Sequence, residues 1–216
     1  MTDSGSTPVP RGGRGRFVTF EGGEGAGKTT LIRALATDLG QSGREVVVTR
    51  EPGGTLLGGE IRRLLLSPDQ HVEAVAELLL YGADRAQHLG EVVRPALARG
   101  AWVLCDRHVD SLVAYQAFGR GLDRVMVEQV NGWATGGLVP DRTLWLDVPV
   151  AEGLRRAGRE RGPDRLEGAG LAFHERVREG FVLLAGEHAS RFRRLDGTRA
   201  PGDVLADAKM ALADLD

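Results

Sequence analysis

The sequence has little cysteine, few aromatic residues and no long apolar run, and these shortages exclude several classes of protein. A single cysteine among 216 residues can form neither an internal disulfide nor a cysteine-based zinc site. No apolar run approaches the roughly 20 residues that a membrane-spanning helix needs. The first 16 residues also lack the apolar core of a secretory signal. We therefore predict a cytoplasmic protein with no membrane partner.

An excess of one charge is missing as well, because 28 basic residues nearly balance 30 acidic ones. A net charge of −2 argues against a protein that coats nucleic acid. The short arginine–glycine tract at 11–16 is a single copy, which is more typical of a solubilising tail than of an RNA-binding arm. We predict no nucleic-acid partner, a disordered tail over residues 1–15 and one domain over 16–216.

Apolar segments alternate with helical patterns along the domain. Short apolar runs at 17–20, 45–49, 101–105, 143–148 and 191–195 predict strands. Helices are predicted at 29–39, 57–66, 71–98 with an end or kink near Pro95, 111–118, 123–134, 150–160, 170–189 and 201–214. This alternation predicts a three-layer α/β fold, in which helices flank a parallel central sheet.

Glycine is abundant, with 31 residues, and four of them lie in the segment 22–29. This segment fits G-x-x-x-x-G-K-[ST] between a predicted strand and a predicted helix, the pattern of a phosphate-binding loop. Glycines let backbone N–H groups surround a phosphate, while Lys28 reaches the transferred phosphate and Thr29 offers a hydroxyl to Mg²⁺. We expect the nucleotide to contact Gly22, Gly23, Glu24, Gly25, Ala26, Gly27, Lys28, Thr29 and Thr30.

Asp106 follows a predicted buried strand, so its carboxylate is well placed beside this loop to join Thr29 in holding Mg²⁺. Arg107, the next residue, could hold the phosphate of an acceptor. The guanine-reading motif N-K-x-D is absent from the sequence, which argues against a GTPase. We therefore predict a P-loop NTPase fold that binds a nucleoside triphosphate and Mg²⁺.

Several further motifs occur in a fixed order: FEGGEGAGKTT at 20–30, TREPGGT at 49–55, DRAQH at 84–88, DRH at 106–108, AYQ at 114–116, RG at 120–121 and DRLE at 164–167. Together they resemble the thymidylate kinases of bacteria over essentially the whole chain from Arg16. The resemblance implies transfer of the γ-phosphate of ATP to dTMP, giving dTDP, with Mg²⁺, in a homodimer.

The resemblance also implies roles for individual residues. Arg62 and Arg107 would clamp the acceptor phosphate, and Tyr81 and Arg85 would stack on and hydrogen-bond the thymine. Tyr115 would exclude a ribose 2′-hydroxyl. The implied substrate-binding set is Glu24, Glu51, Arg62, Tyr81, Arg85, Arg107, Ser111, Tyr115 and Gln116, with Glu51 before a candidate cis-proline at Pro52. Two positions depart from the family pattern: Tyr81 replaces the usual phenylalanine, and Leu112 replaces a small or polar residue.

The arginine-rich segment at about 155–168 is predicted to be a mobile lid. Positions 23–26 of the phosphate loop contain no arginine, yet phosphoryl transfer needs a cation beyond Lys28 and Mg²⁺. The candidates are Arg155, Arg159 and Arg161, which together with Lys28, Glu51 and Arg107 make up the predicted catalytic set.

Two other functions stay open from the residues alone. The chain could be a P-loop kinase for another nucleoside monophosphate or a deoxynucleoside, or a non-catalytic nucleotide-binding module. Cys105 is predicted to be buried and inert, and the histidine spacing indicates no transition-metal site. Trp133 could serve either a dimer interface or the core.

Overall fold

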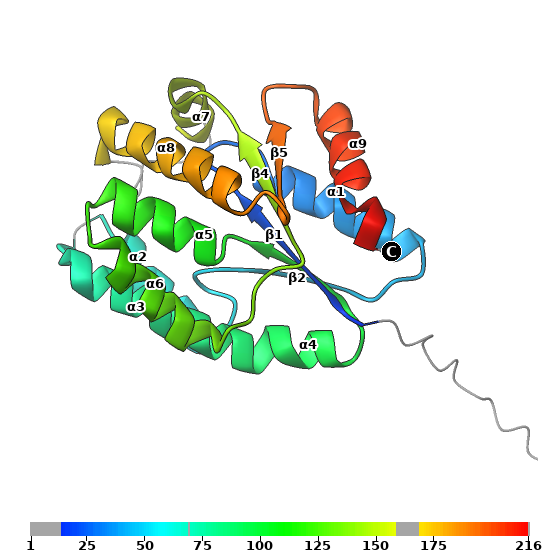
Figure 1. Ribbon diagram of the computed structural model, residues 1–216, viewed down its shortest axis with the longest axis horizontal. Coiled ribbons are helices and arrows are strands. Elements are labelled where there is room, and N and C mark those ends of the chain that lie inside the picture. The colour runs from blue at the N-terminus through cyan, green and yellow to red at the C-terminus, as the bar shows by residue number, and fades with distance from the viewer. Residues whose placement is uncertain (1–13, 69, 159–168, 216) are drawn as a thin grey trace, which may run out of the picture.

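The computed structural model describes residues 14–68, 70–158 and 169–215. Its central sheet has five strands: β1 (Arg16–Glu21), β2 (Val46–Arg50), β3 (Trp102–Asp106), β4 (Arg142–Asp147) and β5 (Phe192–Asp196). The order across the sheet is β2-β3-β1-β4-β5, and every neighbouring pair is parallel (Figure 1). The predicted strands and the parallel sheet are confirmed.

Alternation along the strands sends apolar side chains to both faces of the sheet, as the pleat requires. Val18 and Phe20 of β1 pack with α1 (Lys28–Gln41) and α9 (Pro201–Leu212) on one face. Phe17 joins Val103 and Cys105 of β3 on the other face, which α4 (Arg94–Ala98) covers. Figure 1 shows α1 and α9 on the opposite side of the sheet from α4 and α8 (Leu171–Glu187). The three-layer prediction is confirmed.

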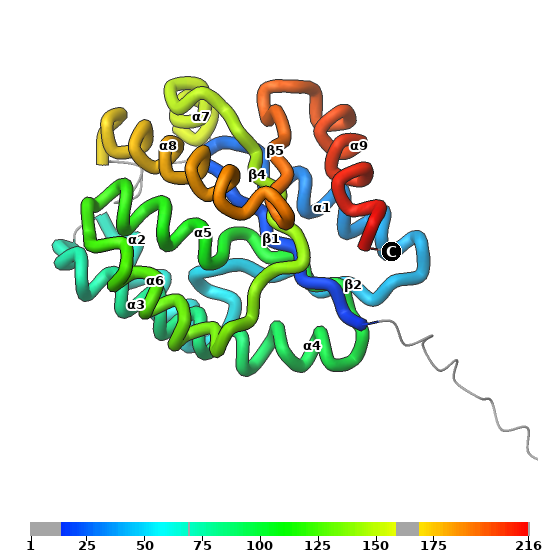
Figure 2. The backbone as a smooth tube through the Cα atoms, in the orientation of Figure 1, coloured from blue at the N-terminus to red at the C-terminus, as the bar shows by residue number. Residues whose placement is uncertain are grey.

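The predicted helices are present, with two local departures. The segment expected at 71–98 is α3 (Ala74–His88), the π-helix η1 (Leu89–Val93) and then α4. Pro95 has no N–H and crowds the preceding turn, and the wider π-turn directly before it accommodates that loss. Likewise α5 (Val109–Leu112) runs into the π-helix η2 (Val113–Gly119), and the tube in Figure 2 follows the chain through both segments.

The other helices match their predictions closely. They are α2 (Leu56–Leu66), α6 (Arg124–Thr135) and α7 (Val150–Ala157), and a 3₁₀ turn at Ala213–Leu215 follows α9. Among the described helices, none combines the length and the hydropathy required to cross a membrane.

The loops that follow β1, β2 and β3 lie at one edge of the sheet, because all three strands are parallel neighbours. This edge brings together the phosphate loop, Glu51 with its cis peptide bond to Pro52, and the pair Asp106 and Arg107. Residues 1–13 of the predicted tail and residues 159–168 of the predicted lid lie outside the described residues, so the disordered tail and the mobile lid stay predictions.

Candidate active site

The phosphate loop connects β1 to α1, and its glycines adopt the backbone conformations that such a loop needs. Gly22, Gly25 and Gly27 have φ values of 137°, 64° and 94°, a region open to glycine and unfavourable for residues with a side chain. Lys28 turns back over the loop, and its Nζ donates to the carbonyls of Gly22 (3.1 Å) and Gly23 (3.0 Å). Burial and the nearby Arg107 charge lower the pKa of Lys28.

A cleft of about 840 Å³ opens over this loop. It is lined by the loop from Glu24 to Thr30, by Asp106 at the end of β3 and Arg107 directly after it, and by Arg156 of α7 and Arg199 before α9. The cleft therefore presents backbone amides and cations, the groups that bind a nucleotide's phosphates. Gly22 and Gly23 complete the loop at its base.

The residues predicted to hold Mg²⁺ fit a cation. Thr29 and Asp106 both line the cleft. Oδ1 of Asp106 is buried and accepts no hydrogen bond from any described residue, so this oxygen is available to a cation or to a water bound to it. A carboxylate oxygen and a hydroxyl at the end of a parallel strand suit Mg²⁺ and its water shell.

A second, smaller pocket of about 80 Å³ adjoins the cleft. All nine residues predicted to bind the acceptor line it: Glu24, Glu51, Arg62, Tyr81, Arg85, Arg107, Ser111, Tyr115 and Gln116. They come from the phosphate loop, the β2–α2 connection, α2, α3, the β3–α5 connection, α5 and η2. Leu112, the departure from the family pattern, lines the same acceptor pocket and is buried.

Four residues line both the cleft and the acceptor pocket: Glu24, Glu51, Arg62 and Arg107. They mark the junction at which groups bound in the two spaces would meet. The two guanidinium groups at that point can bind and neutralise phosphates, and the Glu24 carboxylate holds the guanidinium of Arg107 in place.

Arg107 lies at the centre of the junction. Its φ of 69° is uncommon outside glycine, and its backbone N–H donates to the Phe20 carbonyl at 2.9 Å. Its side chain donates to Glu24 Oε1 at 2.7 Å, and Tyr115 donates to the same oxygen at 2.9 Å. Burial would raise the pKa of Glu24, but Arg107, Lys28 and the Tyr115 hydroxyl outweigh it and hold that pKa at about 2.

Glu51 is buried inside a network that the sequence did not reveal. Its carboxylate accepts from Arg85 Nε at 2.8 Å and lies 2.8 Å from Nδ1 of His88 and 3.1 Å from Nδ1 of His108. Burial alone would raise the pKa of Glu51, yet the Arg85 and His108 partners hold it well below its usual range. Asn131 of α6 completes the network by accepting from Arg85 Nη1 at 2.8 Å.

His88, His108 and Asn131 were not predicted as site residues. Of these, the first two fall inside the motifs DRAQH and DRH, so motif membership was the signal available for them. Glu51, His88 and Cys105 lie close enough to hold a metal ion. Their atoms are engaged within the protein, however: Glu51 with Arg85, His88 Nε2 with Thr49 (2.6 Å), and Cys105 Sγ with the Arg107 carbonyl.

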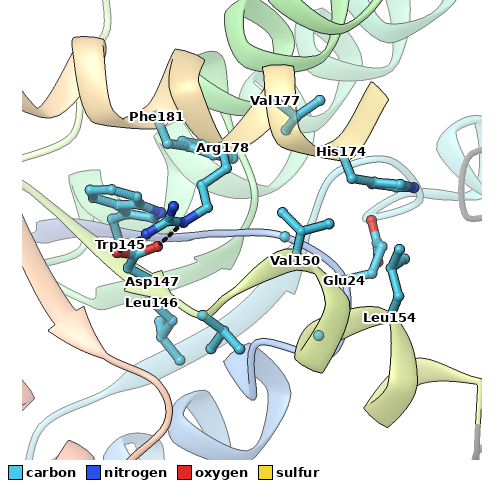
Figure 3. Close-up of a pocket in the computed structure, with 13 residues that line it drawn as sticks. Glu24, Trp145, Leu146, Asp147, Val150, Leu154, His174, Val177, Arg178 and Phe181 are labelled. Carbon is cyan, nitrogen blue, oxygen red and sulfur yellow. Dashed lines mark hydrogen bonds and ion pairs between the residues drawn. The ribbon is translucent and has the colours of Figure 1, made fainter. Parts of the chain in front are cut away.

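A small cavity of about 20 Å³ is lined by residues of α7, α8, the end of β4 and the phosphate loop (Figure 3). Glu24 and His174 lie at one end of it, and an ion pair between Asp147 and Arg178 (2.7 Å) lies at the other. Gly153 of α7 sits against the loop, since a Cβ there would lie 2.4 Å from the Glu24 carbonyl oxygen. The position of α7 is thus coupled to that of the loop.

The two described arginines at the start of the predicted lid, Arg155 and Arg156, lie in different surroundings. Arg155 pairs with Glu152 at 2.7 Å on the surface and is not among the described residues that line the cleft. Its neighbour Arg156 does line the cleft and donates to the Gly197 carbonyl at 2.9 Å. Arg159 and Arg161 lie outside the described residues.

The chain is similar to known proteins of one family. The family model described as thymidylate kinase matches residues 20–207. A thymidylate kinase of Gloeobacter violaceus is 54% identical over 182 residues, covering 83% of this chain and 86% of its own. One from Deinococcus radiodurans is 49% identical over 201 residues, covering 93% and 98%.

A solved structure is similar as well. The crystal structure of thymidylate kinase from Ehrlichia chaffeensis superposes with a TM-score of 0.75 at 33% identity, covering 92% of this chain and 98% of that one. With the family model spanning most of the domain and relatives near 50% identity over nearly their whole length, this chain belongs to the thymidylate kinase family.

Proposed function

We propose that the chain transfers the γ-phosphate of ATP to dTMP, yielding ADP and dTDP, in the presence of Mg²⁺. The observation that carries the proposal is the junction of Glu24, Glu51, Arg62 and Arg107, where the nucleotide cleft meets a pocket of suitable chemistry for a pyrimidine monophosphate. ATP would occupy the cleft, and its terminal phosphate would point toward the acceptor pocket.

The acceptor phosphate would bind between Arg62 and Arg107. Planar guanidinium groups grip phosphate oxygens through paired N–H donors. In the free protein Arg107 donates to Glu24, so an incoming phosphate would share or replace that carboxylate partner.

The base would occupy the part of the acceptor pocket lined by Tyr81, Arg85 and Gln116. Arg85 donates from Nε to Glu51 and from Nη1 to Asn131, and no described residue accepts a hydrogen bond from its Nη2. That N–H group can donate to the O4 carbonyl of thymine. Tyr81 would stack on the ring, and Tyr115, fixed by Glu24, would limit space beside the sugar.

In the proposed reaction an oxygen of the dTMP phosphate attacks the γ-phosphorus of ATP. The bond from that phosphorus to the β–γ bridging oxygen breaks, and ADP leaves. The attacking oxygen is already anionic near neutral pH, so alignment and charge neutralisation are the tasks of the protein. Lys28, Arg107 and the lid arginines (Arg155, Arg159 and Arg161, joined by Arg156) would supply that positive charge.

Thr29 and Asp106 would hold Mg²⁺ in the cleft. The ion would neutralise phosphate charge as it builds up during transfer. Ser111 has a positioning role in this scheme, because its hydroxyl lies between Arg107 Nη1 (3.2 Å) and the buried carboxylate of Glu21 (2.5 Å).

The direct test is a coupled ADP-release assay with Mg-ATP against dTMP, dUMP, dCMP, GMP and AMP. We expect the highest kcat/KM with dTMP. Turnover of GMP or AMP without dTMP would reassign the acceptor, and ATP binding without turnover of any acceptor would favour a non-catalytic nucleotide-binding module.

We also propose a homodimer in the cytoplasm. Exposed apolar side chains gather on α2, α3 and α6: Leu56, Leu57, Val75, Leu79, Val125 and Trp133. α3 packs against both other helices, and the three run side by side in Figure 1. An apolar surface of this kind is typical of a self-association site.

A further inference from the structure

Glu77 is a buried carboxylate of α3 that does not itself line the acceptor pocket in the described part of the chain. It lies one helical turn before Tyr81 and two turns before Arg85, so these three side chains share one face of the helix. Both of those residues do line the acceptor pocket. Glu77 is therefore placed directly behind the region proposed to hold the base.

Its carboxylate accepts hydrogen bonds from two residues of the β3–α6 region. Gln116 Nε2 donates to Oε1 at 2.7 Å, and Arg120 donates to Oε1 at 3.1 Å and to Oε2 at 3.3 Å. The Arg120 guanidinium also lies over the Phe173 ring, 5.0 Å from its centroid. Glu77 and Arg120 thus form an ion pair in which Gln116 holds the carboxylate and the Phe173 ring packs against the guanidinium.

This ion pair decides which way the amide of Gln116 points. A carboxylate paired with a guanidinium is ionised and can only accept, so the amide must present its NH₂ group to Glu77. The reverse orientation would place the amide oxygen 2.7 Å from a carboxylate oxygen, with two acceptors facing each other.

The other end of the amide is then an acceptor without a donor. Oε1 of Gln116 is buried, and it accepts no hydrogen bond from any described residue. Gln116 lines the acceptor pocket and is fully buried. A buried acceptor of this kind is costly unless a ligand supplies the missing N–H.

We infer that Glu77 is a positioning residue for base selection: it fixes Gln116 so that only the amide oxygen faces the acceptor pocket. Beside it, Arg85 Nη2 offers a donor, so the two side chains present one acceptor and one donor. Thymine and uracil carry the matching pair, N3–H and the O4 carbonyl. Cytosine carries the opposite pair, an N3 acceptor and an N4 amino group. This inference rests on the proposed function.

The test compares wild type with Glu77→Gln by calorimetric Kd for dTMP and dCMP, and by the KM for ATP. A neutral amide at position 77 can donate or accept, so Gln116 is released to present either end. We expect the dTMP-over-dCMP preference to fall about tenfold, the value of roughly one hydrogen bond, while the KM for ATP stays unchanged. Glu91→Gln, at an exposed carboxylate that pairs with Gln87, is the matched control and should change neither value.

A swap supplies the rescue. In Glu77→Gln with Gln116→Glu, the amide at 77 donates to the carboxylate at 116, whose second oxygen again faces the pocket as an acceptor. We expect this double variant to recover part of the dTMP preference. An unchanged preference in a folded Glu77→Gln variant would overturn the inference. Absence of dTMP turnover in wild type would instead overturn the proposed function, so the two failures are distinguishable.

A measurement on the wild-type protein covers the case in which Glu77→Gln does not fold. With ¹⁵N-labelled glutamine, the side-chain NH₂ of Gln116 should exchange its protons slowly, and should continue to do so after dTMP binds, because it remains bonded to Glu77. Exchange as fast as that of the exposed Gln87 would overturn the inference.

Discussion

At the scale of single residues, Arg107 joins the two halves of the site. It lines both the nucleotide cleft and the acceptor pocket, and it contacts Glu24, Ser111 and the Gly22 carbonyl. We predict that Arg107→Ala lowers kcat by about a hundred- to a thousandfold, as loss of a preorganised charge at a reacting centre does. ATP should still bind, as measured by calorimetry. Arg99→Ala, which removes an exposed partner of Glu45, is the control; near-normal transfer by Arg107→Ala would remove Arg107 from the reaction.

Glu21, also at residue scale, should make stability depend on pH. Burial and the nearby Asp110 raise its pKa to about 8, against 4.5 for the ordinary group. Between these values the folded state binds a proton that the unfolded state has lost, so the free energy of unfolding falls as pH rises, by up to about 1.4 kcal/mol per pH unit.

Glu21→Gln mimics the protonated carboxyl and can keep the contacts to the His108 N–H and the Ser111 hydroxyl. We predict that the variant gains stability over wild type from pH 5 to pH 8 and loses this part of the slope. Denaturant unfolding at several pH values measures it, and identical slopes in the two proteins would show that Glu21 does not titrate in this range.

At the scale of elements, α7 packs directly against the phosphate loop, with Gly153 on the helix and Gly25 on the loop at the contact. A Cβ on Gly25 would lie 2.0 Å from the Gly153 carbonyl oxygen, and a Cβ on Gly153 would lie 2.4 Å from the Glu24 carbonyl oxygen. No side chain fits between the two backbones. Because α7 also carries Arg156 into the cleft, its seating on the loop sets where that cation lies.

We therefore predict that Gly153→Ala forces α7 away from the loop and lowers kcat/KM for ATP on the order of tenfold to a hundredfold. The fold should survive, because alanine favours a helix more than glycine does. Gly186→Ala in α8 is the matched control, since a Cβ there would meet nothing within 4 Å beyond the neighbouring backbone of its own helix. Equal kinetics in the two variants would mean that α7 and the loop are not coupled.

At the scale of the whole molecule, the exposed apolar side chains on α2, α3 and α6 predict that the protein self-associates. Trp133 is 78% exposed, so the alternative prediction that it packs in the core of its own chain is wrong. We predict a dimer of twice 23.2 kDa by sedimentation and a monomer for Trp133→Glu. Met210→Glu changes another exposed apolar residue, 69% exposed on α9, and should leave the dimer intact; equal sedimentation of both variants would place the interface elsewhere.

Local sequence determined the helices, the strands and the phosphate loop. The phosphate loop, the strands and the motif residues are local features, because glycine conformations, apolar alternation and residue type act over a few neighbouring positions. This is why the sheet and most helix boundaries could be predicted. The family resemblance of the motifs, rather than local pattern, named nine of the residues that line the acceptor pocket. The π-turns before Pro95 and at Val113–Gly119 could not, because they depend on how the helices pack.

Only the tertiary structure decided which side chains hold those residues in place. Glu51 meets His88 and His108 across 37 and 57 positions of sequence, and Glu77 meets Gln116 across 39. No local pattern records such contacts, because strand order and crossover geometry bring these segments together. The same holds for the adjacent arginines of α7: residue type does not tell Arg155 from Arg156, but a helix turns about 100° between neighbours, so one faces solvent and the other faces the cleft.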